Sequence, residues 1–124
     1  MAVLDSSAII HILEGTRQGL IIKENYGDEA LSTTVFSINE VLIGLQGKQK
    51  EEAKAFLTIL DIISFDQNAA FKSVELEEDL RAKGKLINKT DIFIASICIS
   101  HCLPIITTDK DFQNVRSLKV FFVN

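Results

Sequence analysis

The sequence predicts an α/β protein, a three-layer α/β/α sandwich built on a five-stranded parallel sheet. Short apolar runs that suit buried strands alternate with longer segments of helical periodicity, and this alternation is typical of parallel strands joined by helical crossovers. The first run, residues 2–4, is apolar at every position, as expected for a strand buried on both faces. With one proline and six glycines in 124 residues the chain shows no linker, and we expect one domain over residues 1–124.

The expected elements follow one another closely along the chain. Strands are expected at residues 2–4, 30–33, 62–65, 104–107 and 120–123. Helices are expected at residues 7–14, 18–26, 68–83 and 91–102, with Asn68 as the cap of the third of these. Two more helices are indicated by apolar stripes, Ile38, Val41, Leu42 and Leu45 ending at Gly47, and Ala53, Phe56, Leu57 and Leu60. In such a fold the functional crevice lies beyond the carboxyl ends of the strands, where the strand order reverses.

Composition narrows the function classes. A net charge of −4 and a pI near 5.1 argue against a nonspecific nucleic-acid binder, which usually presents a basic face. No apolar run approaches the ~20 residues of a membrane span, and the first residues lack the basic start of a signal peptide, so we expect a cytoplasmic protein. Cys98 and Cys102 flank His101, but a fourth zinc ligand at a usual spacing is absent, and both cysteines are expected in the core.

Four carboxylates stand at expected element ends, and each has a structural explanation. Asp5 follows the first strand and could cap the next helix. Glu40 completes the capping-box pattern that begins at Ser37. Asp91 is expected in the first turn of a buried helix, where the helix dipole stabilises an acid. Asp109 follows the fourth strand and could cap a short helix.

Taken together, the four acids predict a metal site. Asp5 and Asp109 follow strands that a doubly wound order places side by side, and Glu40 and Asp91 are expected in first helical turns near the same edge. Four carboxylates in one crevice repel one another and should have raised pKa values. A hard divalent ion removes this repulsion, and Mg²⁺ prefers oxygen ligands, whereas zinc prefers histidine and cysteine.

At these residues the sequence resembles the PIN-domain family, in particular the VapC toxins of prokaryotes. Four segments carry the resemblance in order: Val3-Leu4-Asp5-Ser6-Ser7, Ser37 to Leu42 around Glu40, Asp91-Ile92-Phe93-Ile94-Ala95, and the T-x-D-x-D-F turn from Thr107 to Phe112. The resemblance implies strand order 3-2-1-4-5 and Mg²⁺- or Mn²⁺-dependent endonucleolytic cleavage of single-stranded or structured RNA.

The resemblance also assigns roles to residues. It implies Asp5 and Asp91 as direct metal ligands, Glu40 as a ligand or an orienter of the nucleophile, and Asp109, with Asp111 as its competitor, as the fourth acid. Ser7 and Thr107 are candidates for holding these carboxylates in place. The basic residues Arg81, Lys83, Lys85 and Lys89 precede Asp91 and are candidates for RNA binding or for a solvated loop. A small antitoxin protein and a homodimer are the expected partners.

Other functions remain to be separated from this one. The phosphatases of the haloacid-dehalogenase type need a second Asp two residues after the first, which Ser7 excludes. A response-regulator receiver domain needs an acidic pair at strand one and an Asp ending strand three, a position that Asp66 nearly fills. A housekeeping RNA-processing PIN nuclease and a PIN-like scaffold without activity are the remaining alternatives.

Overall fold

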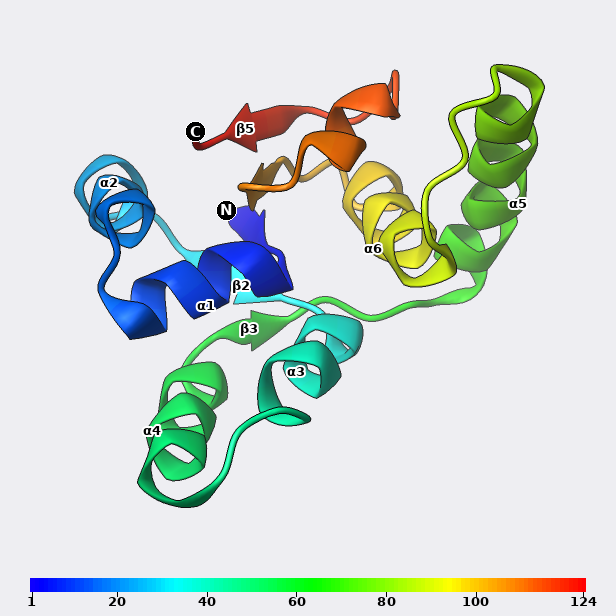
Figure 1. Ribbon diagram of the computed structural model, residues 1–124. Helices are drawn as coiled ribbons and strands as arrows, with labels where there is room; N and C mark the ends of the chain where they lie inside the picture. Colours follow the sequence, from blue (N-terminus) through cyan, green and yellow to red (C-terminus); the bar gives the residue numbers. More distant parts are fainter.

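Five parallel strands form a single sheet in the order β3-β2-β1-β4-β5. The computed structural model describes all 124 residues (Figure 1). The strands are β1 (Ala2–Leu4), β2 (Leu31–Thr33), β3 (Asp61–Ile62), β4 (Ile105–Thr107) and β5 (Val120–Phe122). The helices are α1 (Ser6–Glu14), α2 (Arg17–Tyr26), α3 (Val35–Leu42), α4 (Gly47–Thr58), α5 (Gln67–Ala82), α6 (Lys89–Ser100) and the short 3₁₀ helix η1 (Lys110–Asn114).

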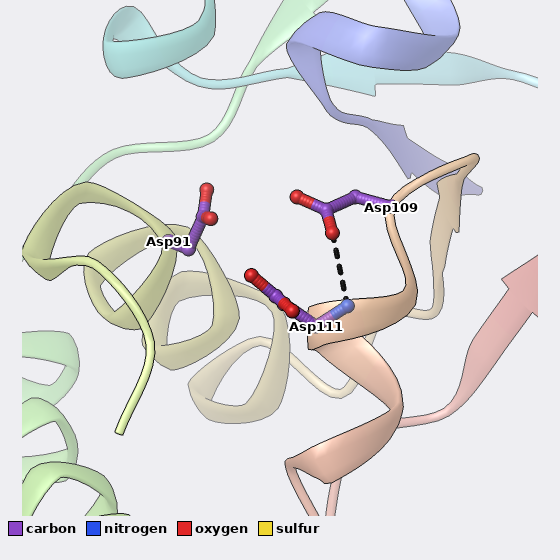
Figure 2. A group of neighbouring side chains, drawn as sticks. All are labelled: Asp91, Asp109 and Asp111. Carbon is purple, nitrogen blue, oxygen red and sulfur yellow. Dashed lines mark hydrogen bonds between the residues drawn. The ribbon is translucent and has the colours of Figure 1, made fainter. Parts of the chain in front are cut away.

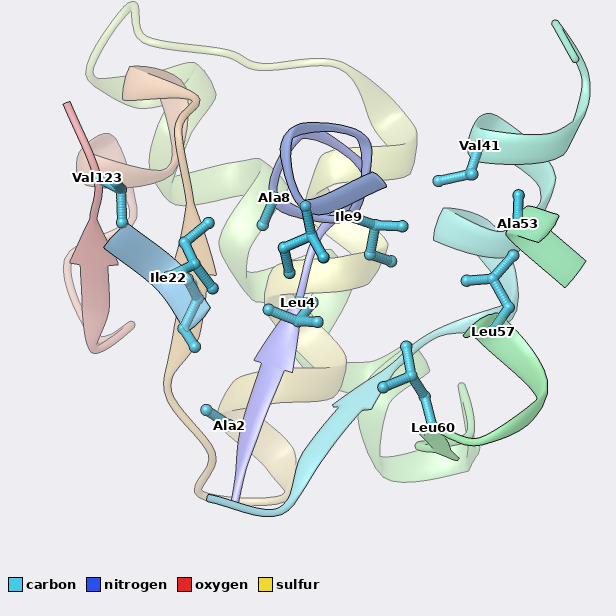
Figure 3. Close-up of a cluster of buried hydrophobic side chains, with 12 residues drawn as sticks. Ala2, Leu4, Ala8, Ile9, Ile22, Val41, Ala53, Leu57, Leu60 and Val123 are labelled. Atoms are coloured by element: carbon cyan, nitrogen blue, oxygen red, sulfur yellow. The ribbon is translucent and has the colours of Figure 1, made fainter. Parts of the chain in front are cut away.

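The sheet is the middle layer of three, because each of its faces carries its own hydrophobic core. Leu4 and Ile106 point to the side of α1–α4, and the core there is drawn in Figure 3. Their neighbours Val3 and Ile105 point to the opposite side, where they pack with α5, α6 and η1. Alternate residues of one strand therefore enter opposite cores, which explains why β1 and β4 are apolar at nearly every position.

The first helical hairpin shows how local sequence sets the geometry around β1. Asp5 caps α1 by accepting a hydrogen bond from the Ala8 amide, and Gly15 ends the helix with a φ of 68°, a conformation that glycine adopts without strain. Gly19 opens α2 against the end of α1, where an added Cβ would lie 2.1 Å from the carbonyl oxygen of His11. The hairpin therefore requires glycine at position 19.

The expected strand order and layers are confirmed, and several expected boundaries are corrected. Of the strand expected at residues 62–65, only the beginning is present, because β3 lies at the sheet edge and ends at Ile62. The stripe expected to continue to Gly47 ends at Leu42, and Gly47 instead begins α4. Asp66 rather than Asn68 caps α5.

Two further expectations concern exposure. Cys98 is buried as expected, but Cys102 lies beyond the end of α6 and is exposed, so only one of the two cysteines belongs to the core. None of the helices is both long and apolar enough to traverse a lipid bilayer.

Candidate metal centre

The carboxyl ends of the two central strands, β1 and β4, define the centre. Asp5 follows β1 directly, and Asp109 follows β4 after one further residue. This is the point at which the chain order reverses, since β1 connects forward to β2 on one side and pairs with β4 on the other. Acids from α3 and from the ends of β1 and β4 act on an acid of α6 here, so four segments of the chain contribute side chains.

Asp5 is both the cap of α1 and a member of the centre. It is 3% exposed, and all its hydrogen-bond partners are donors. Its Oδ1 accepts hydrogen bonds from Ser7 Oγ over 2.7 Å and from the Ala8 amide over 2.9 Å. Its Oδ2 accepts one from Thr107 Oγ1 over 2.6 Å. The capping and the site interpretations therefore hold together.

Thr107 and Ser7 hold the two strand ends in register. The Asp109 amide donates to Thr107 Oγ1 over 2.9 Å, and the Thr108 amide donates to Ser7 Oγ over 3.1 Å. Because both hydroxyls also reach Asp5, the carboxylate on β1 and the backbone after β4 form one hydrogen-bonded unit. These are the positions at which the sequence suggested supporting hydroxyls.

Asp91 lies in the first turn of α6, as expected, and is 7% exposed. Asn88 caps the helix and fixes Asp91 twice: its Oδ1 accepts from the Asp91 amide, and its Nδ2 donates to Asp91 Oδ2, both over 2.8 Å. The sequence signal for Asn88 is a capping residue three positions before an acid and an apolar helix, a pattern that by itself indicates a cap and no place in the site.

Glu40 lies in the second turn of α3, and the expected capping box does not form. Thr34 caps the helix instead, accepting a hydrogen bond from the Ser37 amide over 3.2 Å. Glu40 therefore has no role at the helix end. Its Oε1 is buried and has no hydrogen-bond partner, and it is the one side-chain polar atom of the protein in this state. A buried carboxylate oxygen without a donor costs free energy unless something else binds it.

Asp109 and Asp111 complete the acidic cluster. One carboxylate oxygen from each of Asp91, Asp109 and Asp111 lies within 4.8 Å of the other two, and Figure 2 shows the three side chains converging from α6, from the loop before η1 and from η1. Asp109 is half-buried and caps η1 by accepting from the Asp111 amide over 2.9 Å, whereas Asp111 is exposed. Asp5 and Glu40 lie outside this tight triplet.

The charges of Asp5 and Glu40 act on the acidic cluster through Asp91. The pKa of Asp91 is raised to about 7, chiefly by burial and then by the negative charges of Asp109, Glu40 and Asp5 in that order. Burial also raises the pKa of Asp5, against the lowering effect of its three hydrogen bonds, with a smaller contribution from Asp109. The other three expected acids thus act on Asp91, and Asp109 also acts on Asp5, as repulsion between carboxylates predicts.

The residues present fit a hard divalent cation. The donor atoms are carboxylate oxygens, which Mg²⁺ and Mn²⁺ accept, and no histidine or cysteine faces the cluster as zinc would favour. Glu40 Oε1 is a buried oxygen that lacks a hydrogen-bond partner. Neighbouring carboxylates repel the charge of Asp91, and a bound cation would offset this repulsion.

The basic segment before Asp91 is largely neutralised by α5. Arg81 and Lys89 both bind Glu77, whose pKa they lower through hydrogen bonds, and Lys83 binds Asp79. Lys85 alone of the four forms no salt bridge. These contacts give three of the four cations a structural role, while their use in RNA binding stays a prediction.

The fold and the site define a class of protein, a parallel α/β protein with a cluster of carboxylates at its topological switch point. Comparison with known proteins identifies its family. The family model described as the PIN domain matches residues 2–118. The chain therefore belongs to the PIN domain family.

Curated relatives and solved structures agree with this assignment. Ribonuclease VapC2 of Rickettsia felis is 31% identical over 99 residues, which cover 72% of this chain and 74% of the relative. Ribonuclease VapC5 of Mycobacterium tuberculosis is 26% identical over 117 residues, 89% of this chain and 84% of the relative. The fold is shared with VapBC2 of Rickettsia felis, bound to a DNA fragment from its promoter, with a TM-score of 0.83, 21% identity and coverage of 99% and 98% of the two chains.

The strand order also excludes the receiver-domain alternative. Asp66 follows β3, which lies at the edge of the sheet and is separated from β1 by β2. Asp66 caps α5, and its Oδ2 lies 3.3 Å from His101 Nε2. A receiver would need this residue beside the first strand.

Proposed function

We propose that the chain is a Mg²⁺- or Mn²⁺-dependent endoribonuclease and that residues 1–124 form one PIN-like nuclease domain. The observation that carries the proposal is the buried Glu40 oxygen without a partner beside three converging aspartates. Family membership and relatives named as ribonucleases support RNA as the substrate. The four acids Asp5, Glu40, Asp91 and Asp109 are the proposed site, and Asp91 and Asp5 are its first ligands.

The roles of the residues follow from their contacts. Asp91, fixed by Asn88, and Asp109, fixed by Thr107, present oxygens from two sides of the cluster. Asp5 is oriented by Ser7 and Thr107, and its Oδ2 accepts a single hydrogen bond, which leaves a lone pair of this oxygen for the cation. When bound, the cation supplies Lewis-acid stabilisation of the charge that develops on the scissile phosphate. Glu40 keeps a free oxygen that can accept a proton or orient the attacking water.

The direct test is metal-dependent cleavage. Purified protein is incubated with a mixed pool of single-stranded and structured RNA in Mg²⁺, in Mn²⁺ and in EDTA, with Asp91→Asn as the matched control for a contaminating nuclease. We expect cleavage by the wild type in either metal and none in EDTA or by the variant. Cleavage that persists undiminished in EDTA, or in Asp91→Asn, contradicts the proposal.

We further propose that the protein is the toxin of a VapBC-type pair, with a small antitoxin protein as its partner. An apolar cleft between α2 and α4 supports this, because it offers a docking site for an apolar segment of a partner. Its lining residues include Ile12, Ile22, Leu31, Phe56, Ile59 and Leu60. A small reading frame adjacent to this one, whose product copurifies with the protein and inhibits cleavage, is expected; its absence favours a housekeeping RNA-processing role.

A homodimer is proposed on the mean hydropathy of +0.21 and on large apolar side chains at the surface. Ile43 is 79% exposed and Ile59 77%, and such residues mark contact surfaces when they gather into patches. A two-fold contact would place two acid centres in one assembly. Light scattering at micromolar concentration measures the mass, and a monomer contradicts the proposal.

A further inference from the structure

Three phenylalanine rings from separate elements pack together where α3 meets α6. Phe36 lies in α3, Phe65 in the segment between β3 and α5, and Phe93 in α6. Their ring centroids are 5.6 Å apart for Phe36 and Phe65, 5.4 Å for Phe36 and Phe93, and 4.8 Å for Phe65 and Phe93. We call these three side chains the aromatic cluster.

The aromatic cluster adjoins the acid centre along both helices. Phe36 precedes Glu40 by four residues and therefore lies one turn away on the same side of α3. Phe93 follows Asp91 by two residues, and its contact with Phe36 places it on the side of α6 that faces α3. The negative charge of Glu40 on α3 raises the pKa of Asp91 on α6, so the two helices that carry Phe36 and Phe93 also carry two interacting acids.

The aromatic cluster is not simply part of the hydrophobic core. The ring of Phe112 shows what a core position looks like here, because it is fully buried beneath the sheet. All three rings of the cluster keep part of their surface exposed, and of the three only Phe36 packs against the core on the α5–α6 side. Phe65 and Phe93 thus contribute apolar surface that the folded chain leaves open.

Charge indicates what could cover this surface. RNA must approach a protein of net charge −4 at a cluster of carboxylates, and of Arg81, Lys83, Lys85 and Lys89 all but Lys85 are engaged by Glu77 and Asp79. These salt bridges reduce what this basic segment offers to RNA phosphates. Stacking of a nucleobase on an aromatic ring needs no positive charge and is a common way in which proteins hold unpaired bases.

We propose that the aromatic cluster is a stacking platform for one unpaired nucleobase of the RNA whose backbone is cleaved at the acid centre. The inference rests on the proposed ribonuclease function and adds to it the side chains that hold an unpaired base beside the scissile phosphate. Phenylalanine has no hydrogen-bonding group on its ring, so the platform accepts any base. Sequence preference must then come from other residues.

The test combines ring variants with abasic substrates. Phe65→Leu and Phe93→Leu keep apolar volume and remove the ring, whereas Phe65→Tyr keeps it. Phe121→Leu is the matched control, because Phe121 stacks on Tyr26 away from the site. Each protein is given a short single-stranded RNA that the wild type cleaves, and a series in which one base at a time is removed.

We expect the wild type to lose about five- to hundredfold in kcat/KM at one abasic position, the range for loss of one stacked base. Each leucine variant should lose a similar factor on intact RNA, mostly in KM, and nothing further at that position. Phe65→Tyr and Phe121→Leu should behave as wild type. Binding of the same RNA to Asp91→Asn, with and without Phe65→Leu, gives a readout that does not depend on turnover.

The outcomes separate the two proposals. A wild type that cleaves no RNA in Mg²⁺ removes the ribonuclease function and the platform with it. A wild type that cleaves, with leucine variants as sensitive to every abasic position as the wild type, overturns the platform alone. Leucine variants that lose activity equally at all positions together with a change in molecular mass assign the cluster to a protein contact and also overturn it.

Discussion

Thr107 on β4 donates a hydrogen bond of 2.6 Å to Asp5 after β1, across 102 positions of the chain. The same hydroxyl oxygen accepts the amide of Asp109. One threonine therefore sets the positions of two acids that belong to neighbouring strands. Because all three residues lie at the carboxyl edge of the sheet, the centre depends on the register of β1 against β4.

Thr107→Val tests this relationship. Valine keeps the branched shape but leaves Asp5 Oδ2 and the Asp109 amide without their partner, so we expect a loss of about 1–3 kcal/mol in the free energy of unfolding. Cleavage should fall because both acids lose their orientation. Thermal or urea unfolding and kcat/KM measure the two effects, and Thr107→Ser should restore most of both.

For Asp5 the structure allows a comparison of two variants. Asn also caps helices and removes a buried charge whose pKa is raised, so Asp5→Asn should abolish cleavage while melting in EDTA at or above the wild type. Asp5→Ala loses the cap and should destabilise the protein by about 1 kcal/mol or more. Adding saturating Mg²⁺ should raise the melting temperature of the wild type alone.

If Asp5→Asn melts well below the wild type in EDTA, the carboxylate has a structural role and its charge does not destabilise the metal-free protein. That result would remove Asp5 from the set of mutually repelling acids. The alanine variant serves as the reference for how far loss of the cap alone lowers the melting temperature.

Glu40→Gln separates charge from shape at the buried oxygen. Thr34 caps α3, so the substitution touches no helix end. We expect kcat/KM to fall at least about tenfold, with a nearly unchanged melting temperature in EDTA, since a neutral side chain of equal size replaces an unpartnered carboxylate. Unchanged cleavage in this variant would take Glu40 out of the site.

The raised pKa of Asp91 predicts a pH dependence of stability without metal. Its pKa is about 7 in the folded protein against an ordinary value of 3.8 for aspartate, so the folded state binds more protons than the unfolded chain between these two values. The stabilising contribution is present below pH 4 and is lost as pH rises towards 7. In EDTA, the melting temperature of wild type minus that of Asp91→Asn should therefore fall between pH 5 and pH 7.5.

The same protons affect cation binding, because a carboxylate must lose its proton to become a ligand. The Mg²⁺ concentration for half-maximal cleavage should fall as pH rises to about 7 and then level off. A difference in melting temperature that does not change with pH would contradict the assignment of the raised pKa to Asp91.

Asp109 and Asp111 compete for the role of fourth acid, and the structure favours Asp109. Its charge raises the pKa of both Asp91 and Asp5 and its side chain is half-buried, whereas Asp111 is exposed to solvent. We expect Asp109→Asn to abolish cleavage and Asp111→Asn to reduce it by less than about tenfold. Both variants keep an oxygen at their position. Equal losses in kcat/KM would indicate that the two acids share the role.

The sequence predicted the sheet and its layers because burial on both faces leaves a clear pattern. Val3 and Leu4 enter opposite cores, so β1 had to be apolar throughout. The edge strand β3 was misplaced because an edge position imposes no such pattern: its two residues, Asp61 and Ile62, are exposed. Register and strand length there depend on neighbours that the local sequence does not reveal.

The acids were found through their positions at element ends, but their interactions were only partly predictable. For Glu40 the capping pattern that begins at Ser37 offers a structural explanation beside the predicted site role, but the earlier Thr34 forms the cap. Likewise, no local signal joins Phe36, Phe65 and Phe93, which meet only because three elements pack together. These contacts depend on tertiary packing, which residue spacing along the chain does not reveal.

The order of the acids along the chain bears on when the centre can exist during synthesis. Asp5 and Glu40 leave the ribosome before Asp109, and β1 cannot gain its partner β4 until residues 105–107 have been made. Pairing over such a separation also carries a large loop-closure cost, so it is a late event in folding. A partly made chain therefore holds isolated carboxylates and no centre, and the messenger from which it is translated is not exposed to a premature nuclease.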